Sequence, residues 1–166
     1  MNRHLKQPKR RGEWVEMLFA TEAAARGFTV TKPWGESTRY DLILEKRGRC
    51  LRIQVKSTGF KCRRYNSYAC GLQVNRHMNH YNSSNVDFLA IYILQKAIWY
   101  ILPIRIIKNV KANLTFSPQK KDHKYEAYLD AWHLLECSAG GKSKQPVHRK
   151  KSMRGLLQPA KQAMDR

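Results

Sequence analysis

The clearest strand pattern in the chain is Cys50-Leu51-Arg52-Ile53-Gln54-Val55-Lys56. Apolar and polar side chains alternate along it, and a period of two is typical of a strand that buries one face. Alternation also places Gln54 and Lys56 on the same face, opposite to the apolar side chains. The segment therefore predicts a β-strand that carries a carboxamide and an ammonium close together on its polar face.

A second strand is expected just before it, over residues 39–45. The residues between them, 46–49, have the composition of a hairpin turn, which lays the two strands against each other. Asp41 stands near the beginning of the first strand, and pairing about the midpoint of the hairpin brings it within a few residues of Gln54 and Lys56. A carboxylate, a carboxamide and an ammonium are therefore expected at one end of two neighbouring strands.

The other elements indicate an α/β or α+β core around a central sheet. Helices are expected over residues 12–26 and 122–136, because apolar side chains recur there at helical spacing. Further strands are expected over residues 28–31, 65–74, 86–94, 99–104 and 114–116.

Positive charge is concentrated at the two ends of the chain. The 166 residues include 32 Lys and Arg against 12 Asp and Glu, a formal net charge of +20. More than half of this net charge lies in residues 1–12 and 138–166, and the second segment has few large apolar side chains. We expect a basic N-terminal arm over 1–12, a folded domain over 13–137, and a disordered basic tail over 138–166 that attracts phosphates without sequence preference.

The composition also excludes several classes of protein. The longest apolar stretch, 86–107, is interrupted by charged residues and a proline, so it does not have the apolar length that spans a bilayer. Glu13 and Glu16 lie where the apolar segment of a secretory signal would run. Four cysteines without a Cys-x-x-Cys pair favour reduced thiols. We expect a cytoplasmic, nucleoid-associated protein with no membrane attachment and with nucleic acid as its polyanionic partner.

The predicted cluster of Asp41, Gln54 and Lys56 is of a kind that phosphodiester hydrolysis can use. Oxygen ligands hold Mg²⁺, which lowers the pKa of bound water and stabilises charge on phosphoryl oxygens. A lysine beside the metal positions the attacking water or stabilises the oxyanion. An acid on the preceding helix, Glu16 or Glu13, could complete the pocket. The spacing alone leaves a purely structural role open, because a strand-end Asp and an outward Lys are common on half-solvated sheets.

Four segments, in this order, resemble the core of a known nuclease superfamily. They are Gly12-x-x-x-Glu16, Gly27-Phe28-Thr29-Val30, Ser37-x-x-Tyr40-Asp41-Leu42-Ile43-Leu44 and Leu51-Arg52-Ile53-Gln54-Val55-Lys56-Ser57. Together they resemble the PD-(D/E)XK nucleases over roughly residues 10–137. The run Lys32-Pro33-Trp34-Gly35-Glu36-Ser37-x-x-Tyr40-Asp41 is similar to that of group I intron-associated homing endonucleases, and the likeness to archaeal Holliday-junction resolvases is more distant. The resemblance implies a restriction-endonuclease-like α/β core, with a central mixed sheet flanked by helices, and metal-dependent DNA cleavage.

The resemblance also implies roles for individual positions. Asp41 would be the principal metal ligand, and Glu16, rather than its rival Glu13, would be the helix acid. Gln54 would bind the metal through its amide oxygen and Val55 through its backbone carbonyl.

Lys56 would then be the catalytic amine. Two positions depart from the common pattern: Tyr40 replaces the proline, and Gln54 replaces an acid. A neutral amide holds Mg²⁺ less well than a carboxylate, although the intron-associated enzymes also carry Gln there. Mg²⁺ is the expected cofactor, with Mn²⁺ as an alternative. Because one active site cuts one strand, at least a dimer is expected for cleavage of both strands. The resemblance to the intron-associated enzymes implies a homo-oligomer that is a dimer or a tetramer.

Basic residues interleaved with aromatic ones follow the Lys56 strand, over residues 60–65. This mixture suits phosphate contacts with stacking, although a solvated hairpin is the alternative. Ser37 could help to position the phosphate or could cap a turn. Trp34 is expected to anchor its loop, with stacking on a base as the less favoured alternative. The residues expected to contact DNA here are Lys61, Arg63 and Arg64.

The leading hypothesis is a metal-dependent endonuclease that acts on double-stranded or branched DNA, similar to homing endonucleases. A Holliday-junction or repair nuclease of the same fold is the alternative within this class. A second hypothesis is a DNA-binding protein with weak or no cleavage, and Gln54 is the feature that favours it. A third is a general RNA-binding protein, in which the pattern of Asp41, Gln54 and Lys56 would be a coincidence.

Overall fold

The computed structural model of the protein describes residues 7–35, 37–72, 81, 83–107, 110 and 112–136. Its centre is a five-stranded mixed sheet in the order β1-β2-β3-β6-β7. Within it β3 and β6 run parallel, and the other neighbours are antiparallel. These strands are β1 (Thr29–Thr31), β2 (Leu42–Lys46), β3 (Arg49–Thr58), β6 (Phe88–Ile93) and β7 (Ile98–Pro103).

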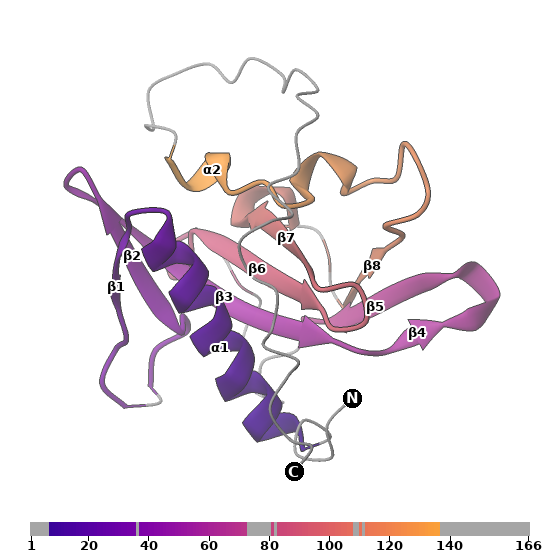
Figure 1. Ribbon diagram of the computed structural model, residues 1–166, viewed down its shortest axis with the longest axis horizontal. Coiled ribbons are helices and arrows are strands. Elements are labelled where there is room, and N and C mark those ends of the chain that lie inside the picture. The colour runs from indigo at the N-terminus through magenta and orange to yellow at the C-terminus, as the bar shows by residue number, and fades with distance from the viewer. Residues whose placement is uncertain are drawn as a thin grey trace, which may run out of the picture.

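The helix α1 (Pro8–Ala25) crosses one face of this sheet (Figure 1). Val15, Phe19 and Ala23 recur every four residues on its buried side, where they join the same apolar cluster as the inward side chains of β2 and β3. The expected helix is therefore present, but it begins four residues earlier, at Pro8. Proline suits a first helical turn because its missing N–H has no partner there. The last residues of the predicted N-terminal arm thus belong to the folded domain.

A second apolar cluster lies on the opposite face of the central sheet. The strand β6 contributes to both clusters, since Ala90 packs in the first and Leu89 and Ile91 pack in the second. This explains its continuous apolar sequence. The second cluster also holds side chains of the three-stranded sheet β4-β5-β8. Its strands are β4 (Lys61–Cys62), β5 (Ser67–Gly71) and β8 (Asn113–Phe116), and η2 (Arg63–Tyr65) joins β4 to β5.

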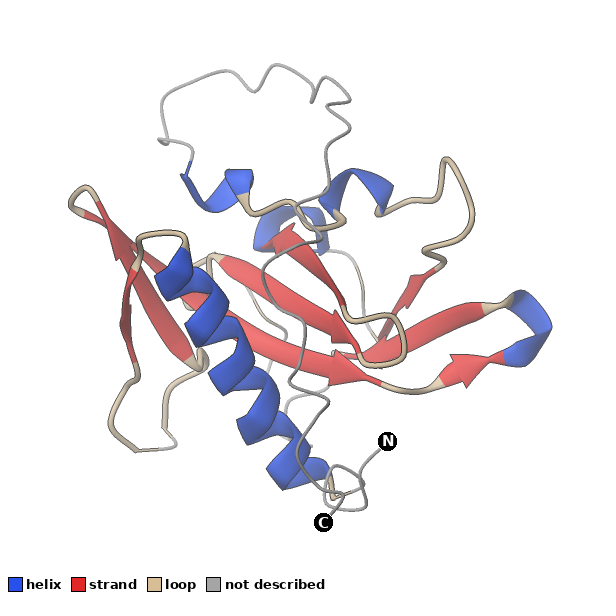
Figure 2. Cartoon of the chain, viewed as in Figure 1, coloured by secondary structure: helices blue, strands red, loops and turns tan. Residues whose placement is uncertain are grey.

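The closing helix predicted over residues 122–136 is wrong. That segment contains only the turns η4 (Glu126–Tyr128) and α2 (His133–Glu136), which Figure 2 shows as short helical pieces beside the long α1. Asp130 has a φ of +46°, outside the helical region. Its N–H donates to the carbonyl of Trp99 over 2.8 Å, and its carboxylate accepts from the Trp99 N–H over 3.0 Å. These contacts tie the chain to β7 and interrupt the helix.

The other predicted elements are present with shifted ends. The strands expected at 28–31, 65–74, 86–94, 99–104 and 114–116 correspond to β1, β5, β6, β7 and β8. After β7 the chain makes a further short turn, η3 (Ile104–Ile107). No helix in the described part of the chain is long and apolar enough to cross a membrane. The predicted tail, 138–166, and residues 1–6 of the predicted arm lie outside the described residues.

Candidate active site

The β2–β3 hairpin places Asp41 beside Gln54. Leu42 pairs with Ile53, and the Asp41 N–H donates to the Ile53 carbonyl over 2.9 Å, which extends the ladder by one residue. The turn between the strands consists of Arg47 and Gly48, which both have positive φ, as two-residue hairpin turns require. The juxtaposition expected from the sequence is therefore present.

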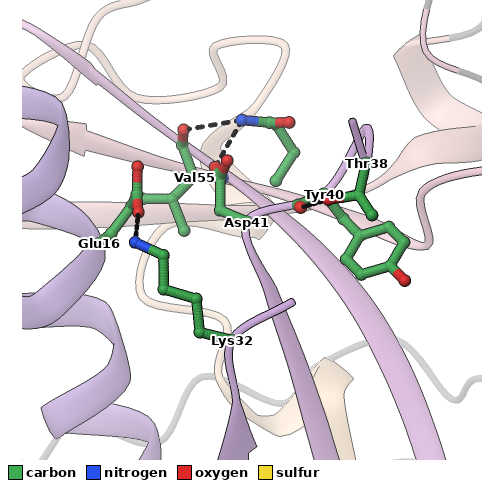
Figure 3. Close-up of polar contacts among 7 residues, drawn as sticks. Glu16, Lys32, Thr38, Tyr40, Asp41 and Val55 are labelled. Atoms are coloured by element: carbon green, nitrogen blue, oxygen red, sulfur yellow. Dashed lines mark hydrogen bonds and ion pairs between the residues drawn. The ribbon is translucent and has the colours of Figure 1, made fainter. Parts of the chain in front are cut away.

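One carboxylate oxygen of Asp41 accepts two hydrogen bonds from β3 at the end of the hairpin, and Figure 3 shows the one from the Gln54 amide. The Oδ2 atom accepts from the Val55 N–H over 2.7 Å and from Gln54 Nε2 over 2.5 Å. The same Nε2 group donates to the Val55 carbonyl over 3.3 Å. Because an ionised carboxylate and a carbonyl only accept hydrogen bonds, Gln54 must turn its NH₂ group toward them. The amide nitrogen thus lies between two oxygens that the sequence predicted as metal ligands.

Asp41 is in an environment that opposes its ionisation. Burial raises the pKa of its carboxyl to about 6, and the negative charge of Glu16 contributes in the same direction. The Val55 N–H and the positive charges of Lys56 and Lys32 act against this rise. A half-buried carboxyl beside a second acid gains from a cation held between them, and such perturbed groups are common at functional sites.

Glu16 is the helix acid whose charge acts on Asp41. Its Oε2 atom is 2.9 Å from Nζ of Lys32, and its side chain is 20% exposed (Figure 3). The hydrogen bond to Glu16 and its negative charge raise the pKa of Lys32. Glu13 is exposed and lies almost one helical turn earlier. Of the two candidates, Glu16 is therefore the one whose charge acts on Asp41, and its role as the second acid stays a prediction.

These acids open onto a surface cleft with a volume of about 410 Å³. Both Glu13 and Glu16 line it, together with Asp41 and two lysines. The opposite wall is the loop between β1 and β2. The described residues that line it are Pro8, Lys9, Gly12, Glu13, Glu16, Lys32, Pro33, Gly35, Thr38, Tyr40 and Asp41. Carboxylates can hold a cation, and the cation together with the surrounding lysines can bind a phosphate, so this lining suits a phosphate group.

Lys56 is half-buried and contacts an aromatic ring that the sequence did not indicate. Its Nζ atom lies 5.5 Å from the ring centroid of Tyr81, which is 7% exposed. Burial raises the pKa of the Tyr81 phenol, and the charge of Asp41 adds to that rise. Tyr81 follows no periodic pattern, so only its position in the folded chain marks it as part of the site.

The predicted DNA contacts are separate from this cluster. Lys61 and Arg64 are exposed on the hairpin formed by β4, η2 and β5, which projects from the body of the molecule in Figure 1. Lys61 is five residues after Lys56, about 16 Å along an extended chain. The backbone of Arg63 lies in η2, on the same projection. Lys61 and Arg64 are not among the described residues that line the cleft.

The loop between β1 and β2 contains two residues for which the sequence predicted a role, Ser37 and Trp34. Ser37 is exposed, and its neighbour Thr38, not Ser37, lines the cleft. Thr38 donates to the carbonyl of Tyr40 over 2.9 Å, and this bond stabilises the loop just before Asp41. Trp34 is fully exposed, so the prediction that it anchors the loop is wrong.

The oxygen atoms at this site fit a hard divalent cation. Among the described residues, no three His, Cys, Asp or Glu side chains gather in a way that could hold a metal. A cation beside Asp41 would have the Asp41 carboxylate and the Val55 carbonyl as ligands, and Gln54 would add its amide oxygen only after its terminal amide rotates, because its NH₂ group faces these two oxygens. Carboxylate and carbonyl oxygens are the ligands that Mg²⁺ accepts, with water in its remaining positions.

Comparison with known proteins identifies the fold and the family. The bacterial homing endonuclease I-Ssp6803I has a TM-score of 0.67 and 24% identity, over 76% of this chain and 91% of its own. The Holliday junction resolvase Hjc of the hyperthermophilic archaeon Archaeoglobus fulgidus has a TM-score of 0.52 and 15% identity, over 76% and 96%. These likenesses confirm the restriction-endonuclease-like fold. None of the curated proteins matches the chain. A family model described as PD-(D/E)XK endonuclease matches residues 6–135, and the chain therefore belongs to the PD-(D/E)XK endonuclease family.

Proposed function

We propose that the protein is a DNA endonuclease that hydrolyses phosphodiester bonds with the help of Mg²⁺, or Mn²⁺ in its place. The observation that carries this proposal is the convergence of Asp41 Oδ2 and the Val55 carbonyl on one point, the amide nitrogen of Gln54. In a member of this nuclease family, two such oxygens beside Lys56 and a second acid, Glu16, are the elements of a hydrolytic site.

A cation bound there would supply an activated water and would neutralise charge on the scissile phosphate. Asp41 and the Val55 carbonyl would hold it, and Glu16 would be the second acid. Gln54 would exchange its NH₂ group for its amide oxygen by rotation of the terminal amide. Lys56, whose ammonium faces the ring of Tyr81, would orient the attacking water or stabilise negative charge on the phosphoryl oxygens.

The proposed partner is double-stranded or branched DNA, bound by the cleft and by the hairpin that carries Lys61, Arg63 and Arg64. The formal net charge of +20 supports a polyanionic partner. Since a single site cuts one strand, we infer that a homo-oligomer, dimer or tetramer, cuts both strands. The place of action that fits this substrate is the cytoplasm, at the nucleoid.

A cleavage assay on the purified full chain tests the proposal. Supercoiled plasmid, linear duplex and a synthetic four-way junction are each incubated with Mg²⁺, Mn²⁺ or EDTA. We expect cleavage only with metal, and loss of cleavage in Asp41→Ala and Lys56→Ala. Arg47→Ala is the matched control, because it removes an exposed positive charge at the far end of the same hairpin.

Cleavage that survives both substitutions would show that the site is elsewhere. Binding without cleavage of any substrate would indicate a DNA-binding protein that has kept only the fold. Strong preference for the junction over the duplex would assign the protein to the branched-DNA alternative.

A further inference from the structure

Trp34 exposes its whole side chain to solvent. Its exposed fraction is 100%, more than that of the next most exposed large apolar residues that the structure describes, Phe60 and Tyr65, at 69% and 66%. Trp99 and Trp132, by contrast, are buried in the first apolar cluster. An indole carries a large apolar surface, and its burial is strongly favourable. In the isolated chain the indole of Trp34 is not buried and gains none of this favourable free energy, so its surface is available to a partner.

The loop around Trp34 is part of the cleft that contains the two acids. Pro33 and Gly35, its direct neighbours, both line that cleft. Lys32, two residues before it, reaches across to Glu16 over 2.9 Å (Figure 3). Gly35 has a φ of +82°, a conformation that favours glycine, and the chain turns directly after the indole. The backbone of Trp34 is therefore at the wall of the cleft, and its fully exposed indole lies outside the set of residues that line it.

The surroundings of Trp34 favour a nucleic acid over a second copy of the chain. Interfaces between protein copies have a core of contiguous apolar residues. Among the described residues next to Trp34 in the sequence, the exposed ones are Lys32, Gly35, Ser37 and Thr38, which are charged, polar or lack a side chain. A flat aromatic ring among lysine and hydroxyl groups matches the pairing of stacking and phosphate contacts by which proteins bind exposed bases.

We propose that Trp34 stacks on an unpaired or unstacked base of DNA next to the phosphate held at the cleft. This inference rests on the proposed function, because it takes the cleft as the place of the scissile phosphate. Bases inside an intact duplex are stacked on both sides and leave no free face for an indole. The contact therefore favours DNA that is distorted or unpaired near the cleavage point, and it makes Trp34 a specificity residue.

The test measures binding in EDTA, so that no strand is cut. A fluorescent duplex and the same duplex with one unpaired nucleotide are titrated with the full chain, Trp34→Ala, Trp34→Phe and Met17→Ala. We expect Trp34→Ala to bind the duplex with the unpaired nucleotide about tenfold more weakly, with the smaller loss on the perfect duplex. Phenylalanine should restore most of the affinity, and the slope of affinity against salt should not change, because no phosphate contact is lost. Met17, which is 62% exposed on α1, is the control for loss of an exposed apolar side chain.

Tryptophan fluorescence supplies a second measurement. DNA should quench the emission of the wild type and shield it from iodide, and Trp34→Phe should lack this change. Equal affinity of Trp34→Ala and the wild type for both duplexes would overturn the proposal. So would a change in Trp34 emission that follows protein concentration without DNA, since it would place the indole between copies of the chain. Neither measurement depends on cleavage. A protein that shows the expected affinity loss and fluorescence change but cuts no DNA would therefore contradict the proposed function and still support the stacking contact.

Discussion

Replacing Asp41 by asparagine is expected to stabilise the metal-free protein while it abolishes the proposed chemistry. The pKa of Asp41 rises from 3.8 to about 6, chiefly through burial. Because a tenfold change in proton affinity corresponds to about 1.4 kcal/mol, the ionised carboxylate destabilises the fold by about 3 kcal/mol at neutral pH. Asparagine removes the charge and, like the protonated carboxyl, keeps an oxygen that accepts from the Val55 N–H. The gain expected at neutral pH is therefore about 3 kcal/mol.

The pH dependence of this gain has a defined sign. A carboxyl whose pKa is raised in the folded state favours the fold when it is protonated, and that contribution is lost as the pH rises through about 6. Below pH 3.8 Asp41 is protonated in both the folded and unfolded states, so the wild type and Asp41→Asn should be about equally stable. The difference should grow between pH 3.8 and about 6 and stay constant above that range.

Urea unfolding in EDTA, followed by circular dichroism between pH 4 and pH 8, measures this difference. Mg²⁺ should then act in the opposite direction, since it binds the native wild type and not the variant. At a free Mg²⁺ concentration about 100 times Kd it would stabilise the wild type by about 2.7 kcal/mol. An Asp41→Asn protein that is no more stable than the wild type at pH 8 without metal, or whose advantage is largest at low pH, would refute the reasoning.

Three further changes test other parts of the molecule. Gln54→Glu replaces an NH₂ donor by an oxygen at the 2.5 Å contact with Asp41, so we expect the variant to be less stable than the wild type in EDTA. Calorimetry should show that it binds Mg²⁺ about tenfold more tightly. An unchanged Mg²⁺ affinity would mean that this side chain does not face the metal. Arg52 donates to both carboxylate oxygens of Asp87 at 3.0 Å, and Arg52→Ala removes these two hydrogen bonds. The free energy of unfolding should fall by about 2 kcal/mol, and DNA cleavage per folded molecule should not change. A fall of less than about 0.5 kcal/mol would contradict this. Deleting 138–166 should weaken DNA binding and flatten its dependence on salt, as measured by fluorescence anisotropy, and an unchanged slope would exclude the tail as a phosphate binder.

The sequence by itself determined the central hairpin and what lies at its end. Alternation in β3, a two-residue turn with glycine and the position of Asp41 are all local features, and a strand pair joined by a short turn has almost no freedom in its register. That is why Asp41, Gln54 and Lys56 could be placed at one end of two neighbouring strands from the sequence, whereas the role of Val55 was implied only by the family resemblance. The same local reasoning failed for residues 122–136, where helical spacing of apolar residues was overridden by the two hydrogen bonds between Asp130 and Trp99.

Only the tertiary structure decided which groups from distant segments complete the site. The packing of α1 on the sheet turns Glu16 toward Asp41 and Lys32, while Glu13, three residues earlier, stays exposed. Tyr81 reaches Lys56 from a segment without periodicity, and Trp34 stays in water although its size predicts burial. The physical reason is that the hydrogen-bonded ladder of neighbouring strands transmits local sequence directly into geometry, whereas these side chains are positioned by the packing of segments far apart in the chain.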